Sequence, residues 1–318
     1  MRIAVVHNPT SGDAHPTRAE LLATLARHGH QADYYSSVRE WREEVGEAPE
    51  LVVVAGGDGT IRKLARRVAD ATLPLTILPL GTANNVARAL GLTDRPIDEL
   101  VDGWRTGTIK RFDLGTVEGP WGSDVFLESA GVGVLAATMH DIDEGGSGNV
   151  NALDGADARM SAALDVLETV AARSSPFRAR LQLDARTIED EYVLVETLNF
   201  GGAGPNLQFS PDGNPHDAML DVVAVSWAER ERLADFVAAR RGGAGEPPAL
   251  LPATRAQRVQ VDASAGPLHV DDRLVTLETA DPVRFEAAVR AAALSFLIPA
   301  SATDAVNPPD GPALRHIA

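Results

Sequence analysis

The sequence predicts two domains: an N-terminal α/β domain with a doubly wound parallel sheet, and a C-terminal domain that is a mainly antiparallel β-sandwich. In the first third of the chain, apolar strand-like runs alternate with helix-like segments, the order that produces a parallel sheet. From about residue 111, apolar and polar residues alternate with a period of two, as in antiparallel strands with one buried face. The 318 residues also fit two domains of ~100–200 residues each.

The first domain is predicted from three apolar runs and the helices that follow them. The strands are residues 3–6, 51–55 and 75–78, and the last two are continuous apolar runs typical of strands covered on both faces. Pro16 opens the first helix, which carries leucines at helical spacing. The next two helices are residues 61–69 and residues 85–90, the latter closed by Gly91.

The second domain is predicted from short strands with two helices among them. The strands are residues 125–128, 178–183, 191–198, 220–225, 259–261 and 275–277, and the helices are residues 160–172 and 229–240. The predicted limits are residues 1–118 for the α/β domain, which residues 287–300 could rejoin, and residues 119–286 for the β-sandwich. Residues 301–318 contain three prolines and little pattern, so we expect a disordered tail.

Composition excludes several classes of function. Forty-five acidic against 29 basic residues give a net charge of −16, which repels phosphate backbones and makes nucleic-acid binding unexpected. The absence of cysteine excludes disulfides, thiolate metal sites and a cysteine nucleophile. No apolar run approaches the ~18 residues of a spanning helix, and no secretory signal follows Met1. We therefore expect a cytoplasmic protein that touches membrane surfaces only transiently.

The strongest local signal is the run Gly56-Gly57-Asp58-Gly59-Thr60 between a buried strand and a helix. Glycines let the backbone approach a ligand, and the start of the helix offers N–H groups and about half a positive charge to a phosphate. The Asp58 carboxylate is suited to holding Mg²⁺ beside that phosphate. The alternative is a tight strand-to-helix turn in which Asp58 is only a cap.

Two further polar loops follow neighbouring strands. Asn8-Pro9-Thr10-Ser11-Gly12 comes after the first strand, and Gly81-Thr82-Ala83-Asn84-Asn85 follows the strand at 75–78. Because the carboxyl ends of parallel strands meet at one edge of a sheet, the three loops should line a single crevice. Together they predict a nucleotide-phosphate site.

The order of motifs along the chain resembles the diacylglycerol kinase catalytic-domain family, which includes sphingosine kinases and bacterial lipid kinases. The motifs are the three loops above, Asp113-Leu114-Gly115, Asp217-Ala218-Met219-Leu220-Asp221-Val222, and His269-Val270-Asp271-Asp272. The glycine run alone is shared with NAD kinases and phosphofructokinases, whereas the ordered set is specific. The resemblance implies that ATP binds between two domains and that Mg²⁺ assists transfer of a phosphoryl group to a lipid hydroxyl such as that of diacylglycerol.

The resemblance also implies roles for individual residues. Asp271 matches the general base, Asp58 and Asp113 would organise the catalytic Mg²⁺ through water, and Asp217 matches a second, structural magnesium site. Asn8, Ser11, Gly57, Thr60 and Thr82 would contact the nucleotide. The complete set of predicted nucleotide-binding residues is Asn8, Ser11, Gly12, Gly56, Gly57, Asp58, Gly59, Thr60, Gly81, Thr82 and Asn84. This chain departs from the family pattern at Asn85, where many members have Asp, and at Arg273, where Glu is usual.

Three alternative functions stay open at this point. The first is a kinase for a soluble acceptor such as NAD, and the second is a nucleotide-binding protein without turnover. The third is a dinucleotide oxidoreductase, because Gly131-Val132-Gly133-Val134-Leu135-Ala136 fits the dinucleotide fingerprint, although no acid-ended strand follows at the required distance. The family resemblance also suggests a homodimer.

Overall fold

The computed structural model describes residues 1–11, 15–44, 48–69, 72–145, 149–241, 253–264, 266–275 and 282–300. The chain forms two compact units: unit 1 comprises Met1–Phe112 with Ala292–Ala318, and unit 2 comprises Asp113–Ala291. The sequence analysis ended the first domain at residue 118 and let the chain rejoin it at residue 287, whereas the units divide after Phe112 and at Ala292. The predicted disordered tail, residues 301–318, lies outside the described residues.

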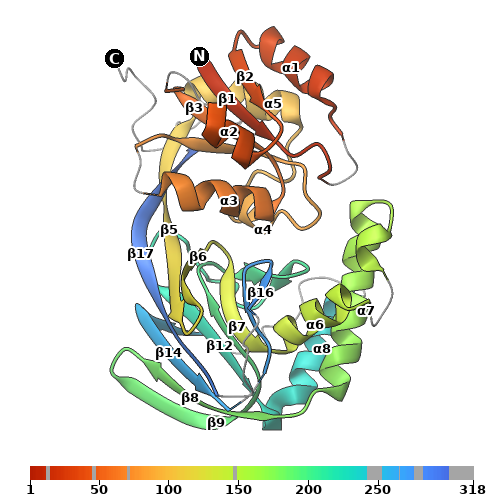
Figure 1. Ribbon diagram of the computed structural model, residues 1–318, viewed down its shortest axis with the longest axis vertical. Helices are drawn as coiled ribbons and strands as arrows, with labels where there is room; N and C mark the ends of the chain where they lie inside the picture. Colours follow the sequence, from red (N-terminus) through yellow and green to blue (C-terminus); the bar gives the residue numbers. More distant parts are fainter. Residues whose placement is uncertain are drawn as a thin grey trace. The chain divides into compact units, whose positions relative to one another are not determined.

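Unit 1 contains a parallel sheet in the order β2–β1–β3–β4–β17 (Figure 1). Every pairing along this order is parallel. Its strands are β1 (Arg2–His7), β2 (Gln31–Tyr35), β3 (Leu51–Gly56) and β4 (Leu75–Pro79), with the last part of β17 (Val283–Ile298). Its helices are α1 (Arg18–Arg27), α2 (Val38–Glu44), α3 (Asp58–Val68), α4 (Asn85–Ala89), α5 (Ile97–Asp102) and the 3-10 turn η1 (Gly103–Thr106).

Helices cover both faces of the sheet in unit 1. The β1–β2 and β3–β4 connections run toward opposite edges, so right-handed crossovers place α1 and α3 on opposite faces. Consistent with this, α1 contacts α5, whereas α2 contacts α3. All six residues of β3 are buried, as expected for a strand covered on both sides. The loops after β1, β3 and β4 therefore emerge at the same edge of the sheet.

Unit 2 consists mainly of antiparallel strands, which confirms the predicted fold class. They are β5 (Thr108–Gly119, which begins in unit 1), β6 (Gly122–Phe126), β7 (Ser129–Gly133), β8 (Phe177–Leu183), β9 (Arg186–Leu198), β10 (Gly202–Ala203), β11 (Leu207–Gln208), β12 (Leu220–Ser226), β13 (Thr254–Ala256), β14 (Arg258–Ala263), β15 (Leu268–Val270), β16 (Arg273–Val275) and the first part of β17. The long strand β9 is the centre of the unit, because its first half pairs with β8 and its second half with both β7 and β12.

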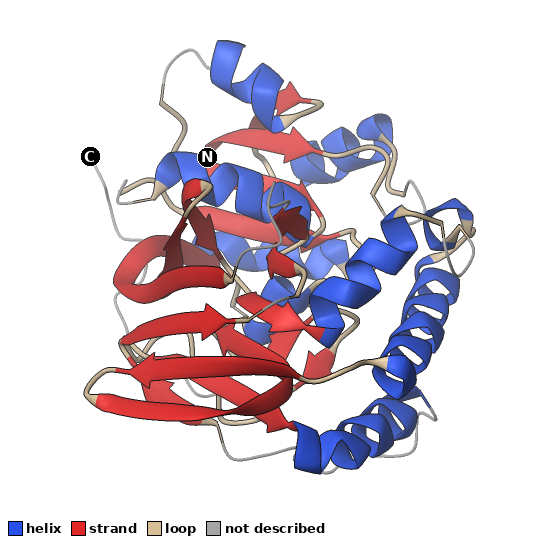
Figure 2. Ribbon diagram, turned by 60° about the horizontal axis from the view of Figure 1, so that its bottom comes forward, coloured by secondary structure: helices blue, strands red, loops and turns tan. Residues whose placement is uncertain are grey.

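Three helices gather on one side of these strands (Figure 2). They are α6 (Val134–Asp143), α7 (Ala156–Arg173) and α8 (Arg230–Arg241), and the 3-10 turns are η2 (Val150–Ala152) and η3 (Trp227–Glu229). Apolar side chains from α6, α7 and α8 pack on β9 and β12 to form one core. A second core lies among the strands themselves. Within the described residues no helix is long and apolar enough to cross a membrane.

The proposed dinucleotide fingerprint has a packing explanation. Its glycines end β7 just before α6 begins. Gly133 has a φ of 107°, and a Cβ there would lie 2.2 Å from the carbonyl oxygen of Val193. A Cβ at Gly131 would lie 2.3 Å from the carboxylate of Glu196. Both glycines are therefore required by close packing within unit 2.

Candidate active site

The first group of predicted residues forms the loop edge of unit 1, defined here as residues 8–11, 57–60 and 81–84. Asn8 anchors the first loop: its N–H donates to the carbonyl of Ala55 in β3 at 2.9 Å. The Asn8 side-chain oxygen accepts from the N–H and the hydroxyl of Thr10 at 3.2 and 2.9 Å, and its carbonyl accepts from the N–H of Ser11 at 3.1 Å. Gly12 lies outside the described residues.

The second and third loops touch through their glycines. A Cβ at Gly81 would lie 2.4 Å from the Cα of Gly57, and a Cβ at Gly57 would lie 2.9 Å from the Cα of Gly81. Backbone atoms cannot move aside as a flexible side chain can, so both positions require glycine. The N–H of Leu80 adds a hydrogen bond of 3.2 Å to the carbonyl of Gly56. The contact holds the start of α3 beside the loop after β4.

The start of α3 has the form of an anion site. Its N-cap is Gly57, which has no side chain to cap the helix. The Gly57 carbonyl accepts from the N–H groups of Thr60 and Ile61 at 2.9 and 3.2 Å, so the helix is regular from its first turn. Gly59 lies in that turn, and Thr60 is buried with its hydroxyl 2.9 Å from the place a Cβ of Gly56 would occupy. An 11-residue helix with an open N-terminus presents N–H donors and partial positive charge to a phosphate.

Asp58 caps a second helix. Its two carboxylate oxygens accept from the N–H groups of Asn85 and Val86 at the start of α4, each at 3.0 Å. Asn84, the N-cap of α4, has a left-handed φ of 52°, and its amide turns back to the N–H and carbonyl of Gly81 at 2.8 and 2.7 Å. The Asn84 side chain therefore closes its loop, and the Asp58 carboxylate ties α3 to α4.

Asp58 also fits water-bridged Mg²⁺. It is a carboxylate beside the open N-terminus of α3, and its two oxygens are held in place by backbone N–H groups. Within the residues described, no three His, Asp or Glu side chains gather to ligate a metal directly. Mg²⁺ in phosphoryl-transfer sites usually keeps several waters and uses only one or two carboxylates together with substrate phosphates.

In unit 2, Asp113 and Asn199 form a buried junction. Asp113 donates its N–H to the carbonyl of Pro215 at 2.7 Å and accepts at its carboxylate from the N–H of Ala218 at 2.7 Å. The fully buried Asn199 amide donates to the carbonyls of Asp113 and Leu127 at 2.9 and 3.0 Å. The sequence analysis missed Asn199, although an Asn at the end of an apolar strand and just before two glycines was a usable signal.

Asp271 lies in the two-residue turn between β15 and β16 rather than on a strand, and has a left-handed φ of 50°. Its carboxylate accepts three backbone N–H groups, from Leu127 at 2.9 Å, Glu128 at 2.9 Å and Ser129 at 3.2 Å. Its own N–H donates to the carbonyl of Ser129 at 2.8 Å. These donors stabilise the ionised carboxylate and fix its position. Asn199 binds the carbonyls of Leu127 and Glu128 in the same segment, so residues 127–129 connect Asp113 to Asp271 within unit 2.

The departure at Arg273 has a structural counterpart. The Arg273 guanidinium donates to the almost fully buried carboxylate of Asp124 in β6 at 2.7 Å. This ion pair ties the strand that follows the Asp271 turn to β6. The positive charge of Arg273 is thereby matched within unit 2.

Asp217 faces a guanidinium. One carboxylate oxygen accepts from the N–H of Met219 at 3.0 Å, and the other binds Arg255 in β13. Arg255 lies opposite Asp221 in the β12–β13 ladder. Burial raises the pKa of the Asp221 carboxyl, and Asp217 raises it further, while Arg255 opposes this. The half-exposed guanidinium of Arg255 therefore pairs with the acid that was predicted to bind a second magnesium ion.

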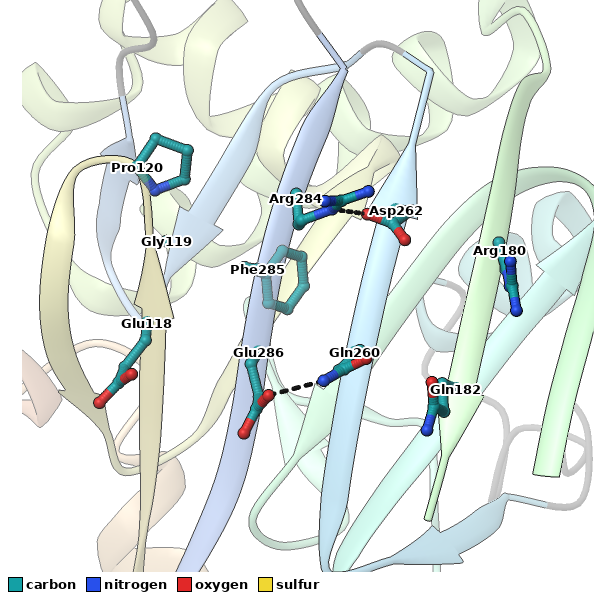
Figure 3. A pocket seen from close by; sticks show the side chains of 10 residues that line it. All are labelled: Glu118, Gly119, Pro120, Arg180, Gln182, Gln260, Asp262, Arg284, Phe285 and Glu286. Atoms are coloured by element: carbon teal, nitrogen blue, oxygen red, sulfur yellow. Dashed lines mark hydrogen bonds and ion pairs between the residues drawn. The ribbon is translucent and has the colours of Figure 1, made fainter. Parts of the chain in front are cut away.

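A hollow on unit 2 contains none of the predicted site residues. It has a volume of about 670 Å³ and lies over the outer faces of β5, β17, β14 and β8. Figure 3 shows its polar side chains pairing with one another, Arg284 with Asp262 and Gln260 with Glu286. A second, mainly apolar hollow of about 550 Å³ lies between α6, the end of α7 and the start of β8, and is lined by Val134, Val170 and Phe177 among others.

The predicted residues thus fall into two groups, each described within its own unit. Unit 1 brings together Asn8, Ser11, Gly57, Asp58, Thr60, Gly81, Thr82 and Asn84 on one sheet edge. Unit 2 joins Asp113 to Asp271 through Asn199 and residues 127–129. Asp217 belongs to a separate ion-paired cluster.

Comparison with known proteins gives consistent matches. Residues 2–117 match the family model for the diacylglycerol kinase catalytic domain. A diacylglycerol kinase of Mycobacterium tuberculosis (strain ATCC 25618 / H37Rv) is 27% identical over 311 residues, covering 94% of this chain and 95% of that protein. A diacylglycerol kinase of Bacillus subtilis (strain 168) is 25% identical over 248 residues, covering 74% of this chain and 76% of that protein.

A solved structure extends the likeness to the fold. The crystal structure of a diacylglycerol kinase from Bacillus anthracis str. Sterne matches with a TM-score of 0.66 at 19% identity, covering 93% of this chain and 96% of that chain. The match therefore includes both the α/β unit and the antiparallel β unit.

Proposed function

We propose that this chain, whose residues 2–117 match the diacylglycerol kinase catalytic domain and which is similar to a diacylglycerol kinase over 94% of its length, transfers the γ-phosphoryl group of ATP to the hydroxyl group of a neutral lipid such as diacylglycerol. The observation that carries the proposal is the contact between Gly57 and Gly81. It holds the open N-terminus of α3 and the loop after β4 together, within the segment that matches the family model.

Unit 1 supplies the nucleotide site in this proposal. Phosphoryl transfer asks the protein mainly to position the phosphates and to neutralise their charge. The N–H groups at the start of α3 bind phosphate oxygens, and Gly59 leaves room for them. The Thr60 and Thr82 hydroxyls and the loop of Asn8 and Ser11 complete the walls. Asp58 would hold Mg²⁺ through water, and the bound ion would neutralise charge on the phosphates.

Unit 2 supplies the proton acceptor. As the lipid hydroxyl oxygen bonds to the γ-phosphorus and the bond to the ADP oxygen breaks, the hydroxyl proton passes to the carboxylate of Asp271. Three backbone donors hold that carboxylate in place, and a positioned carboxylate can act as a general base. The apolar hollow beside α6 supports an acceptor that carries hydrocarbon chains. The net charge of −16 favours a neutral lipid over an anionic one.

An assay with several acceptors tests the proposal. Purified protein is incubated with radiolabelled ATP, MgCl₂ and diacylglycerol in neutral mixed micelles, with NAD, or without acceptor. We expect labelled phospholipid only with diacylglycerol. Labelled product with NAD instead would indicate the soluble-acceptor kinase. Calorimetric ATP binding without product in any arm would indicate a nucleotide-binding protein without turnover.

A loop variant tests the nucleotide site by itself. Gly59→Val should abolish calorimetric ATP binding while the protein stays folded, because the side chain blocks the approach of phosphate to the start of α3. Wild-type ATP affinity in a folded Gly59→Val protein would show that the phosphates do not bind at the start of α3.

A further inference from the structure

We propose that the buried pair Glu196–His269 is a positioning device that holds the Asp271 turn, with its hold set by one shared proton. The inference rests on the proposed function, since it gives Asp271 the role of proton acceptor. Glu196 and His269 belong to neither group of predicted site residues. The pair lies deep in unit 2, and each side chain is almost fully buried, with exposed fractions of 0% for Glu196 and 4% for His269.

The strand ladder explains how the two side chains meet. His269 in β15 lies opposite Gly131 in β7, and Gly131 lies opposite Glu196 in β9. Residues opposite each other in a sheet share a face, so the glutamate and the histidine stand on either side of a glycine. Because Gly131 has no side chain, Glu196 reaches across β7, and its carboxylate oxygens both lie 3.0 Å from Nε2 of His269. A Cβ on Gly131 would lie 2.3 Å from that carboxylate.

The other ring nitrogen of His269 reaches the Asp271 turn. Nδ1 lies 2.9 Å from the carbonyl oxygen of Asp271. Together with the N–H of Asp271 on Ser129 and the three N–H groups on its carboxylate, this contact engages the polar groups of Asp271 on all sides. His269 therefore fixes the peptide that carries the proposed proton acceptor.

The pair needs a proton to make both contacts. A carbonyl oxygen and a carboxylate are acceptors, so both ring nitrogens of His269 must carry hydrogen, or else Glu196 must carry one. Burial alone would lower the pKa of His269, but the charge and hydrogen bond of Glu196, together with Asp271, raise it. The hold is therefore fully present below the ordinary pKa of a histidine and is lost as the pH rises through the raised pKa of His269.

Charged groups on neighbouring elements do not replace the pair. The elements packed against β15 are β6, β7, β16 and α6. Strand β7 carries no titratable residue, and Asp124 of β6 pairs with Arg273 of β16. The titratable residues of α6 all lie in its last turn, at His140, Asp141 and Asp143. Glu196 and Asp271 are the charged groups that act on His269.

Glu196→Gln separates positioning from mere packing. With Gln at this position, a neutral His269 can donate from Nδ1 to Asp271 and accept at Nε2 from the amide, so both contacts persist without a titrating proton. We expect kcat near the wild-type value at pH 7, and we expect the alkaline decline of wild-type kcat to disappear. His269→Leu and Gly131→Ala, which break the pair in different ways, should lower kcat about 10- to 100-fold with little change in the KM for ATP.

Val261→Ala is the matched control, because Val261 is a fully buried residue of unit 2 on β14. It should lower thermal stability and leave both kcat per folded molecule and the pH profile unchanged. The inference is overturned if Glu196→Gln keeps the wild-type alkaline decline, or if His269→Leu loses activity only in proportion to the unfolded fraction, as the control does.

Hydrogen exchange keeps this test separate from the lipid assay. NMR reports the protonation of His269 as the pH is raised. As His269 loses its proton, amide protection at residues 127–129 should fall in wild-type protein and stay constant in Glu196→Gln. If wild-type protein phosphorylates diacylglycerol but neither amide protection nor kcat depends on the Glu196–His269 pair, the inference fails and the proposed function stands. If no acceptor is phosphorylated but protection follows the pair, the proposed function fails, and the hold on the Asp271 turn stands.

Discussion

The loop edge of unit 1 and the Asp271 turn of unit 2 both fix a carboxylate with backbone N–H groups, but over different separations in the chain. Asp58 takes its donors from the next strand–helix connection, 27 and 28 positions away. Asp271 takes its donors from residues 127–129, which are 142 to 144 positions away. The first site is a property of consecutive βα units. The second exists only because β15 pairs with β7.

The buried histidines of the two units differ in the same way. His30 in unit 1 packs against the ring of Trp104, 5.2 Å between centroids, and burial lowers its pKa to about 4. His269 in unit 2 is buried as well, yet Glu196 raises its pKa. The comparison shows that burial alone favours a neutral histidine, and that a partner brought from a distant strand reverses the sign.

The largest effect is expected at the Asp271 turn. Asp271→Asn cannot accept the hydroxyl proton, so kcat should fall about 10²- to 10⁴-fold while the KM for ATP changes little. The amide also offers only one oxygen to three N–H donors, so some loss of thermal stability should accompany the change. Steady-state kinetics per folded molecule measure the first effect, and thermal unfolding measures the second.

Asp272→Asn is the control for this variant, because Asp272 is exposed in the same two-residue turn. It should keep near-wild-type activity. An inactive Asp272→Asn beside an active Asp271→Asn would transfer the role of proton acceptor to Asp272.

A second large effect concerns the stability of unit 1 in acid. His30 is disfavoured as imidazolium in the folded state, so the folded protein loses stability as the pH falls from 6.5 toward 4. The loss should approach about 3 kcal/mol. Urea unfolding of wild-type protein between pH 7 and pH 4 measures it, and His30→Leu should remove this part of the pH dependence. An unchanged acid limb in His30→Leu would assign the loss to other groups.

A smaller effect is expected from the loop edge. Asp58→Asn leaves one of the α4 N–H groups facing an amide nitrogen, which should lower the free energy of unfolding by about 1–3 kcal/mol. The apparent affinity for Mg²⁺ in the kinase assay should fall too. Asp33→Asn on the exposed side of β2 should change neither quantity. Full stability together with full Mg²⁺ dependence in Asp58→Asn would refute both roles of this carboxylate.

The smallest effect is expected at Arg255, which is half exposed. Arg255→Ala should cost about 0.5–1 kcal/mol at pH 7. The deficit should shrink toward acid pH, because burial raises the pKa of Asp221 and a protonated carboxyl no longer needs the guanidinium. Thermal unfolding of wild-type and variant protein at pH 7 and at acid pH measures both points.

The sequence by itself determined the class of the fold and the loop edge of unit 1. The continuous apolar runs at β3 and β4 indicate parallel strands that are covered on both faces. Because the polar loops directly follow these strands, the sequence was enough to place the loops at the same edge of the sheet. It missed β17, whose Ala-rich middle has no clear strand period. It found that Gly131 and Gly133 fit a dinucleotide fingerprint but favoured close packing as their role, and both glycines are closely packed in the structure.

Only the tertiary structure decided what surrounds the acids of unit 2. The sequence placed Asp217 and Asp271 in motifs that resemble those of the family. It did not show that Arg255 pairs with Asp217, or that N–H groups of residues 127–129 bind the Asp271 carboxylate. These neighbours come from strand pairings between distant segments, and the register of such pairings has no local signal in the chain. For the same reason the contact between Glu196 and His269 could not be predicted. It depends on the register of β9, β7 and β15, which places the two side chains on either side of Gly131.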